Sequence, residues 1–289
     1  MNSTNKSSLY IVATPIGNLK DITLRALEIL KNSHIILAED TRITGKLLAN
    51  LNIRYEQKLI SCHDFNEEHR IEQVKNFLDN GQIVALVSDA GTPLISDPGY
   101  KIVSKLRQLN YNIIPIPGVS AVITSLSAAG IPSDTFMFKG FLSSKKNKRQ
   151  ETLISFKTLN TTMVLYESVH RIEFLLEDIS EILPDFDIVV AKELTKQFEK
   201  FVSGKPHEVK KYFENNKDKV KGEFVVLIDC KNKEKKSTYE ISEDLLLRAL
   251  IKELPLKKAV KITTEILNLK RNDIYEKALQ IKKLEDLNV

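Results

Sequence analysis

The residues best suited to chemistry stand in loops that follow short hydrophobic runs. The loop at 14–19 brings Pro15 and Gly17 directly after the first run, and the loop at 87–99 is built largely from Ser, Asp, Gly, Thr and Pro. Such residues fix tight turns and let a ligand approach the backbone, and so long a loop in a compact domain is usually functional. We expect these loops, with the small-residue segment at 117–122, to form a crevice for a polar small molecule.

Acidic side chains follow the second hydrophobic run. Glu39 and Asp40 are adjacent, and Arg42 stands two residues later. Carboxylates beside an arginine could supply a general base and the cation that orients it. Asp40 could instead cap a helix that begins at Thr41, which would explain one acid and leave Glu39 unexplained.

Charged groups recur at the ends of two later hydrophobic runs. One run is followed by Glu167, His170 and Arg171, and the other ends in Lys192 and Glu193. Groups of these types can handle a proton or hold a phosphate. Each cluster alone is a weak signal, but strand ends on one side of a fold could bring them to the same crevice.

A basic segment at 139–149 contains Phe141 and no acidic residue. Lysine and arginine neutralise phosphates, and an aromatic ring can stack on a base. The candidate RNA-binding residues are Lys139, Phe141, Lys145, Lys146, Lys148 and Arg149. A solvated helix face explains the segment equally well, and both interpretations stay open.

Several common chemistries are disfavoured by the sequence. Neither a G-x-G-x-x-G nor a G-x-x-x-x-G-K-[ST] pattern occurs, so a Rossmann dinucleotide site or a P-loop is not expected. Val122 stands where a serine nucleophile at Ser120 would require glycine. Two cysteines and the spacing of His63 and His69 match no standard zinc site, so no metal is expected.

The elements that must position these loops are predicted to form two α/β halves. In the first half, strands alternate with helices, as in a fold with a mostly parallel sheet. The predicted strands of the first half are 9–14, 34–40, 83–90 and 112–117, and its predicted helices are 22–33, 41–52, 69–80 and 100–110. The second half is predicted to contain helices at 119–129, 170–183 and 207–215 and strands at 135–139, 162–168, 187–194 and 223–230. Pro115 and Pro117 mark the expected hinge between the halves.

A third part follows a charged run at 231–236, which is typical of a solvated linker. Residues 231–289 hold 14 Lys/Arg and 10 Asp/Glu and predict three short helices, at 242–254, 257–267 and 273–284. This part could be a nucleic-acid-binding bundle, similar to a helix-turn-helix, or a bundle that packs on the protein itself. We therefore expect three regions, at 1–116, 117–230 and 231–289.

Composition agrees with a globular protein. The 289 residues are 42% hydrophobic and 28% charged, with a net charge of +5 that permits an anionic partner without requiring one. The sequence contains no apolar run long enough to span a membrane and no apolar stretch typical of a signal peptide near its first residue. With only two cysteines, the reducing cytoplasm is the expected location.

Taken together, these loops resemble the tetrapyrrole methylase superfamily, and within it the methyltransferases that act on small-subunit ribosomal RNA. A segment at 253–279 is similar to the helical module of that group. The resemblance covers 9–230 and rests on VATPIGNLKDIT (12–23), AEDTR (38–42), CHDFNE (62–67), VSDAGTPLISDPG (87–99), PIPGVSA (115–121), KGFL (139–142), YESVHR (166–171), KELTK (192–196) and GEFVVLI (222–228).

The resemblance implies a two-domain α/β fold, usually a homodimer, that binds S-adenosylmethionine (SAM) in the cleft between its domains. By position, the cofactor-binding residues would be Pro15, Ala90, Gly91, Thr92, Ile95, Ser120, Ala121, Glu167 and Leu194. Ser143 and Val169 stand where the group usually has proline, and Lys192 where it has arginine. These departures could alter loop stiffness or a charge contact, but they lie outside the cofactor loops.

The activity implied is methylation of a ribose 2′-oxygen in 16S rRNA of the small ribosomal subunit, at cytidine 1402 of the decoding region. Candidates for the base or its orienting group are Glu39, Asp40, His170 and Glu193, while Arg171 and Lys192 could hold phosphate or neutralise charge. The main alternative is a SAM-dependent methylase of a tetrapyrrole or another small metabolite. A module that binds SAM or RNA without turnover is a further alternative.

Overall fold

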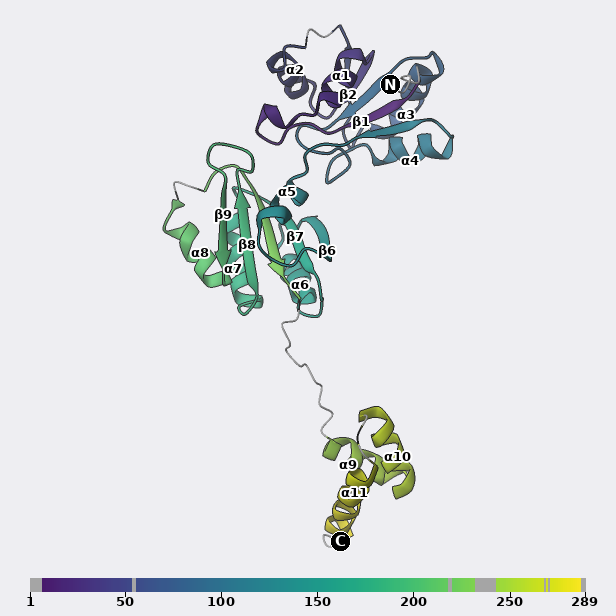
Figure 1. Ribbon diagram of the computed structural model, residues 1–289, viewed down its shortest axis with the longest axis vertical. Helices are drawn as coiled ribbons and strands as arrows, with labels where there is room; N and C mark the ends of the chain where they lie inside the picture. Colours follow the sequence, from purple (N-terminus) through teal and green to yellow (C-terminus); the bar gives the residue numbers. More distant parts are fainter. Residues whose placement is uncertain are drawn as a thin grey trace. The chain divides into compact units, whose positions relative to one another are not determined.

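The computed structural model describes residues 7–53, 56–217, 220–231, 243–267, 269 and 271–286. The chain divides into two compact units, Met1–Lys231 and Asn232–Val289. Figure 1 labels helices and strands where there is room. Among the described residues, the first unit contains two five-stranded sheets and the second contains three helices.

The first sheet is parallel throughout. Its strands are β1 (Leu9–Val12), β2 (Ile35–Ala38), β3 (Lys58–Ser61), β4 (Val84–Val87) and β5 (Ile113–Ile116), in the spatial order β3-β2-β4-β1-β5. Strands β2 and β4 are buried at every position, because helices cover both faces of the sheet. Burial on both faces explains why these strands are continuous apolar runs in the sequence. The prediction of a parallel α/β sheet is confirmed for this half.

Helices cover both faces of the first sheet. On one face, α1 (Leu24–Asn32) and α2 (Thr41–Asn50) contribute Ala26, Ile29, Leu30 and Leu48 to a buried cluster. On the other, α3 (Glu67–Asp79) and α4 (Tyr100–Gln108) contribute Val74, Leu78, Ile102 and Leu106. A short 3-10 helix, η1 (Leu19–Asp21), follows the first loop.

The second sheet is mainly antiparallel. Its strands are β6 (Phe136–Phe141), β7 (Thr162–Ser168), β8 (Asp187–Lys192), β9 (Lys200–Gly204) and β10 (Glu223–Asp229), in the order β6-β7-β10-β8-β9. The β6–β7 pair is parallel and the other three pairs are antiparallel. The mostly parallel sheet was predicted for the first half alone. The sequence gives no strand direction for the second half, because a buried apolar strand shows the same run of residues in either direction.

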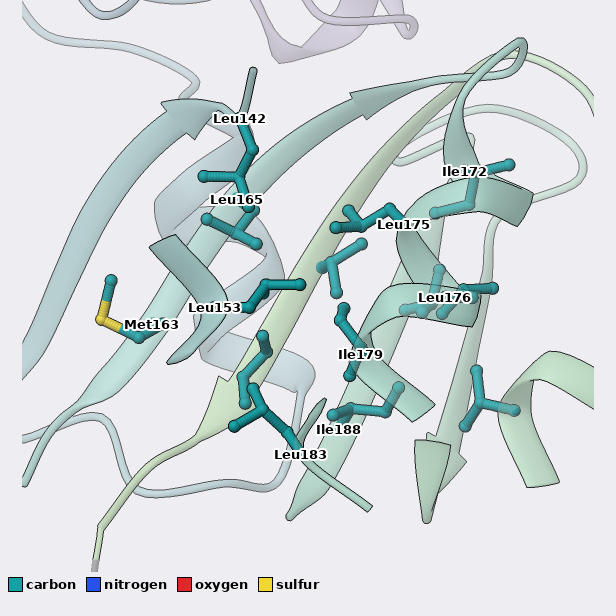
Figure 2. Packing of buried hydrophobic residues seen from close by; sticks show 14 of the residues in the cluster. Leu142, Leu153, Met163, Leu165, Ile172, Leu175, Leu176, Ile179, Leu183 and Ile188 are labelled. Atoms are coloured by element: carbon teal, nitrogen blue, oxygen red, sulfur yellow. The ribbon is translucent and has the colours of Figure 1, made fainter. Parts of the chain in front are cut away.

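Both faces of the second sheet are also covered. Helices α6 (Lys146–Phe156), α7 (Ile172–Ile182) and α8 (Pro206–Glu214) pack on one face in the largest buried cluster, part of which Figure 2 shows. Helix α5 (Ala121–Ala128) covers the other face through Val122 and Leu126. Ile16, from the loop after β1, packs against this second cluster and so joins the two halves of the unit.

The second unit is a three-helix module. It consists of α9 (Glu243–Glu253), α10 (Leu256–Leu267) and α11 (Arg271–Asp286), whose buried residues are Leu247, Val260, Ile274, Ala278 and Ile281. Three helices were predicted in this part, whereas most of the charged run at 231–236 lies outside the described residues. Across the part of the chain that the structure describes, no helix is both long enough and apolar enough to cross a bilayer.

An ion pair is buried beneath α6. Arg149 Nε lies 2.6 Å from Asp178 Oδ2, and the two side chains are 7% and 1% exposed. Arg149 also donates to the carbonyl oxygens of Ser143 and Ser144, and Gln150 donates to the other oxygen of Asp178. These bonds satisfy a guanidinium that would otherwise be costly to desolvate.

We expect Asp178→Ala to lower the free energy of unfolding by about 3–5 kcal/mol, because it leaves the Arg149 charge buried without its partner. Urea denaturation followed by circular dichroism measures the loss. The double replacement Arg149→Met with Asp178→Leu should recover most of it, since a buried ion pair is often replaceable by apolar groups of similar size.

The control is Glu181→Ala, which removes an exposed carboxylate from α7, the helix that also carries Asp178. It should change the free energy of unfolding by about 0.5 kcal/mol or less. Equal, small effects of Asp178→Ala and Glu181→Ala would show that the buried pair does not hold α6 in place.

Candidate functional site

A pocket of about 320 Å³ lies where the loops of the first sheet meet those of the second. Its volume is at the lower end of the range for small-molecule sites. The first sheet supplies the loops after β1, β2 and β4, and the second supplies the ends of β6, β7 and β8 and the start of β10. The lining residues are Ile16, Glu39, Asp89, Ala90, Gly91, Thr92, Ile95, Ser96, Asp97, Ser120, Ala121, Phe141, Tyr166, Glu167, Ser168, Glu193, Leu194, Lys196, Glu223, Phe224 and Val225.

Backbone hydrogen bonds tie the first-sheet loops to one another. Thr14 and Gly91 exchange N–H···O bonds of 2.8 and 3.0 Å, and the Thr14 hydroxyl donates to the Ser88 carbonyl at 3.3 Å. The Thr92 hydroxyl donates to the Val119 carbonyl at 2.9 Å, which links the long loop to the entry of α5. These bonds fix the wall of the pocket through backbone groups and the hydroxyls of Thr14 and Thr92.

The long loop after β4 contains strained backbone. Leu94 and Ser96 have φ angles of 73° and 68°, in the left-handed region that few residues other than glycine adopt. Gly99 has a φ of 124°, and a Cβ there would lie 2.7 Å from Leu86 Cδ2. Strain of this kind persists where surrounding contacts enforce it, and it is concentrated at functional sites.

The loop after β8 is held against the first sheet. Glu193 and Thr195 have φ angles of 51° and 64°, and Asn18 N donates to Thr195 Oγ1 at 3.1 Å. A Cβ on Gly17 would lie 2.5 Å from Lys196 Cγ, so only glycine allows this close approach. Lys196 pairs with Glu193 at 3.0 Å inside the pocket.

The pocket is strongly acidic. Among the described residues, Lys196 is the one lysine or arginine that lines the pocket, and six acids line it: Glu39, Asp89, Asp97, Glu167, Glu193 and Glu223. Burial raises the pKa of Asp97 to about 6, and the negative charges of Glu39 and Asp89 add to this effect. Burial, followed by the charge of Asp89, also raises the pKa of Glu39. The site therefore suits a cation and disfavours a phosphate.

Glu167 forms the inner end of this acidic wall. It is 1% exposed, and its Oε1 accepts a hydrogen bond of 2.9 Å from Ser168 N. Burial raises the pKa of Glu167, and Arg171 at 3.2 Å partly opposes that rise. Arg171 also donates to the Leu142 carbonyl, so its guanidinium contacts protein groups at two points.

The structure brings together most of the residues expected to hold a cofactor. Pro15 does not line the pocket, but its neighbour Ile16 does. The other eight expected residues line it: Ala90, Gly91, Thr92, Ile95, Ser120, Ala121, Glu167 and Leu194.

The candidate catalytic residues are divided by the structure. Glu39 and Glu193 line the pocket, whereas Asp40, His170, Arg171 and Lys192 do not. Asp40 caps α2 by accepting from Arg42 N at 2.8 Å, and its ion pair with Arg42 lowers its pKa to about 2. A carboxyl so readily ionised is a weak base, which favours the capping role for Asp40.

The basic segment is only partly available to RNA. Lys139, Lys145, Lys146 and Lys148 are exposed, and Phe141 is 55% exposed at the edge of the pocket. Arg149 is buried in its pair with Asp178, so we remove it from the candidate RNA-binding residues. Helical spacing explains this, because Arg149 shares the inward face of α6 with Leu153 and Phe156.

Sequence reasoning did not select several pocket residues. Asp89 and Asp97 lie inside the loop that was singled out, but nothing in their spacing distinguished them from turn residues. Tyr166, Ser168 and Glu223 also line the pocket. These three residues stand at strand ends, within the segments 166–171 and 222–228 that carry the family resemblance. That position is the feature of the sequence that could have identified them.

Comparison with known proteins places this architecture in a family. A family model described as Tetrapyrrole (Corrin/Porphyrin) Methylases matches residues 8–210, and one described as RsmI C-terminal HTH domain matches residues 242–282. A protein of Vibrio cholerae named ribosomal RNA small subunit methyltransferase I is 44% identical over 94% of both chains. A protein of the same name from Escherichia coli O157:H7 is 42% identical over 96% of both chains.

Solved structures agree with the fold. A cobalt precorrin-4 methyltransferase superposes with a TM-score of 0.56 at 18% identity, over 77% of this chain and 95% of that one. Uroporphyrin-III C-methyltransferase from Thermus thermophilus, solved with S-adenosylhomocysteine, gives 0.51 at 18% identity over 76% and 96%. The two-sheet unit and the helical module are both matched by family models, and the chain thus belongs to the tetrapyrrole methylase family and, within it, to the ribosomal RNA small subunit methyltransferase I family.

Proposed function

We propose that this protein transfers a methyl group from SAM to the ribose 2′-oxygen of a cytidine in the 16S rRNA of the small ribosomal subunit. The relatives that carry the rRNA methyltransferase name share 42–44% of their residues with nearly the whole chain. The observation that carries the proposal is the acidic pocket between the loops of the two sheets. Its acidic residues suit a positively charged sulfonium donor, and its opening gives the acceptor nucleotide access to that donor.

The residues present fit SAM as the donor. Ile16, Ile95 and Leu194 give the pocket apolar walls, and Gly91 and Ala121 allow a ligand to approach the backbone closely. The carboxylates of Glu39, Asp89 and Asp97 face the same space and would favour a positively charged ligand. When bound, SAM supplies an electrophilic methyl group on a positively charged sulfur.

The reaction needs a base and an aligned acceptor. The 2′-oxygen forms a bond to the methyl carbon while the carbon–sulfur bond breaks, and the electron pair of that bond stays on sulfur. The proton of the 2′-hydroxyl passes to a carboxylate of the pocket. We assign this role to Asp97, since a base with a pKa of about 6 is ionised at neutral pH and still accepts a proton effectively.

The acceptor side is basic and aromatic. Phe141 stands at the pocket with its ring 5.7 Å from that of Tyr166, and exposed lysines follow at the start of α6. An exposed ring beside the pocket could stack on an unpaired base while the lysines neutralise phosphates. The same proposal includes a role for the helical module in binding RNA and the homodimeric state implied by the family resemblance. It also includes a cytoplasmic location, where ribosomal subunits are found.

The test uses purified protein, methyl-labelled SAM and small subunits from cells that lack this protein. We expect label in one cytidine of 16S rRNA, with resistance to alkaline cleavage on its 3′ side. Label in a tetrapyrrole or another small molecule, with none in the subunits, would replace the proposal with small-molecule methylation. Binding of SAM without transfer to any acceptor would indicate a module without turnover.

Ala121→Leu should block the cofactor pocket. The added side chain projects from the first residue of α5, which lines the pocket, and overpacking of this size costs about 1–3 kcal/mol. We expect S-adenosylhomocysteine to bind about 5- to 150-fold more weakly by isothermal titration calorimetry.

The matched control is Ala128→Leu, at the exposed last residue of the same helix. It should bind S-adenosylhomocysteine as the wild type does. Equal binding by both variants would show that the cofactor lies elsewhere.

The assignment of Asp97 predicts a pH profile. A base acts in its deprotonated form, so kcat/KM should be constant above a pH of about 6 and fall about tenfold per unit below it. Asp97→Asn should lower kcat by about 100-fold or more and remove this acidic limb.

Glu39→Gln serves as the comparison, because it removes a neighbouring carboxylate that also lines the pocket. It should shift the limb to lower pH, since one negative charge that raises the pKa of Asp97 is gone. An acidic limb that persists unchanged in Asp97→Asn would assign the proton to another group.

A further inference from the structure

A second concavity adjoins the pocket. It is a groove of about 540 Å³ lined by Lys192, Glu193, Gln197, Phe198, Glu199, Lys200 and Lys221. Glu193 lines both the groove and the acidic pocket, so one residue of the loop after β8 separates the two spaces. None of the candidate RNA-binding residues from the sequence lines this groove. Lys192, which does line it, was expected from the sequence to hold phosphate or neutralise charge.

Lysines give the groove its character. Lys192 is 5% exposed and ends β8, while Lys200 begins β9 directly opposite it in the antiparallel register. Lys200 Nζ lies 5.0 Å from the centre of the Tyr212 ring, and Lys221 is exposed just before β10. The start of β9 and the segment before β10 thus bring two exposed lysines to one groove, beside the buried Lys192.

The two acidic residues of the groove are already engaged. Glu193 pairs with Lys196 at 3.0 Å, and Glu199 Oε2 accepts a hydrogen bond of 2.6 Å from Thr195 N. Both contacts lie within the turn that carries the strained residues Glu193 and Thr195. The acids therefore shape the turn, and the exposed Lys200 and Lys221 supply the charge that a ligand in the groove would meet.

Phe198 adds an aromatic surface. Its side chain is 68% exposed although it lies between the engaged Glu199 and the turn. A ring this exposed beside three lysines combines the two features that bind single-stranded nucleic acid, a surface for base stacking and a positive charge for the backbone.

The neighbouring pocket explains why such a groove is needed. Its six carboxylates repel phosphate, yet an RNA acceptor must bring a ribose hydroxyl to it. The phosphates next to the target nucleotide must then lie on another surface close to the pocket. We infer that the groove binds, through Phe198, Lys200 and Lys221, a single-stranded RNA segment next to the methylated ribose. This inference rests on the proposed function and deepens it.

The test uses two variants. One is a double variant that combines Lys200→Gln and Lys221→Gln, and the other is Phe198→Ala. The substrates are small subunits from cells lacking this protein, with binding followed by filter retention and methyl transfer by labelled SAM. The double variant should bind about tenfold more weakly, and its slope of log affinity against log salt should fall by about 1.4, as expected for two lost phosphate contacts. Phe198→Ala should bind about 5- to 150-fold more weakly with little change in slope.

The matched control is Lys31→Gln with Lys105→Gln, which removes two exposed lysines from helices of the first sheet. It should keep the wild-type affinity and slope. All variants should retain wild-type affinity for S-adenosylhomocysteine, because the changed residues do not line the acidic pocket.

The outcomes separate the two proposals. A wild-type protein that binds subunits but transfers no methyl group contradicts the proposed function, while the binding comparison still tests the groove. Unchanged affinity and salt slope in both groove variants would overturn the inference. A change in molecular mass by light scattering for Phe198→Ala, with unchanged RNA affinity, would overturn it in favour of contact with a second copy of the chain.

Discussion

The charge of the central pocket constrains the rest of the structure. At 4 Å, two like charges repel by about 1 kcal/mol in water and about 4 kcal/mol near a protein surface. Six acidic residues line this space, and two of them, Glu167 and Glu193, have cationic partners. A cationic donor is favoured there, whereas a phosphate at the same depth is repelled several times over. An RNA acceptor can therefore present only its sugar to the pocket. Its backbone must be neutralised by groups on other elements, which are found on α6, on β9 and before β10.

The walls of the pocket are built from backbone that is held in place on both sides. Leu94, Ser96, Glu193 and Thr195 all have left-handed φ angles, each at a cost of about 1–3 kcal/mol. Such residues persist because neighbouring chain fits closely against them: a Cβ on Gly17 would lie 2.9 Å from Thr195 Oγ1, and a Cβ on Gly99 would lie 3.1 Å from Leu94 Cδ1. The Thr14–Gly91 hydrogen bonds add a direct link between two loops. The pocket is consequently formed by the fold itself, and ligand binding does not have to create it.

How far the sequence predicts this structure depends on what each residue contacts. Strands such as β4 and β7 were predicted because apolar residues in a short run indicate burial on both faces, but the same run carries no direction, so the antiparallel second sheet was not foreseen. The short strands β3 and β9 have mixed burial and give little signal. The loops around Gly91 and Ser120 were found from composition. The sequence left capping and catalysis open for Asp40, and it did not single out Asp97, because their pKa values depend on Arg42 and on burial that only the folded chain creates.

The same distinction applies to positive charge. The segment at 139–149 looks uniformly basic in sequence, yet Arg149 faces inward with Leu153 and Phe156 while the lysines around it face solvent. The charge available to RNA is therefore smaller on α6 than composition indicates. It is larger near β9 and β10, where no basic run occurs and the fold brings the exposed Lys200 and Lys221 to one groove. Because each phosphate contact adds a similar, salt-dependent increment to binding, several such surfaces acting together would bind an RNA more tightly than any one of them.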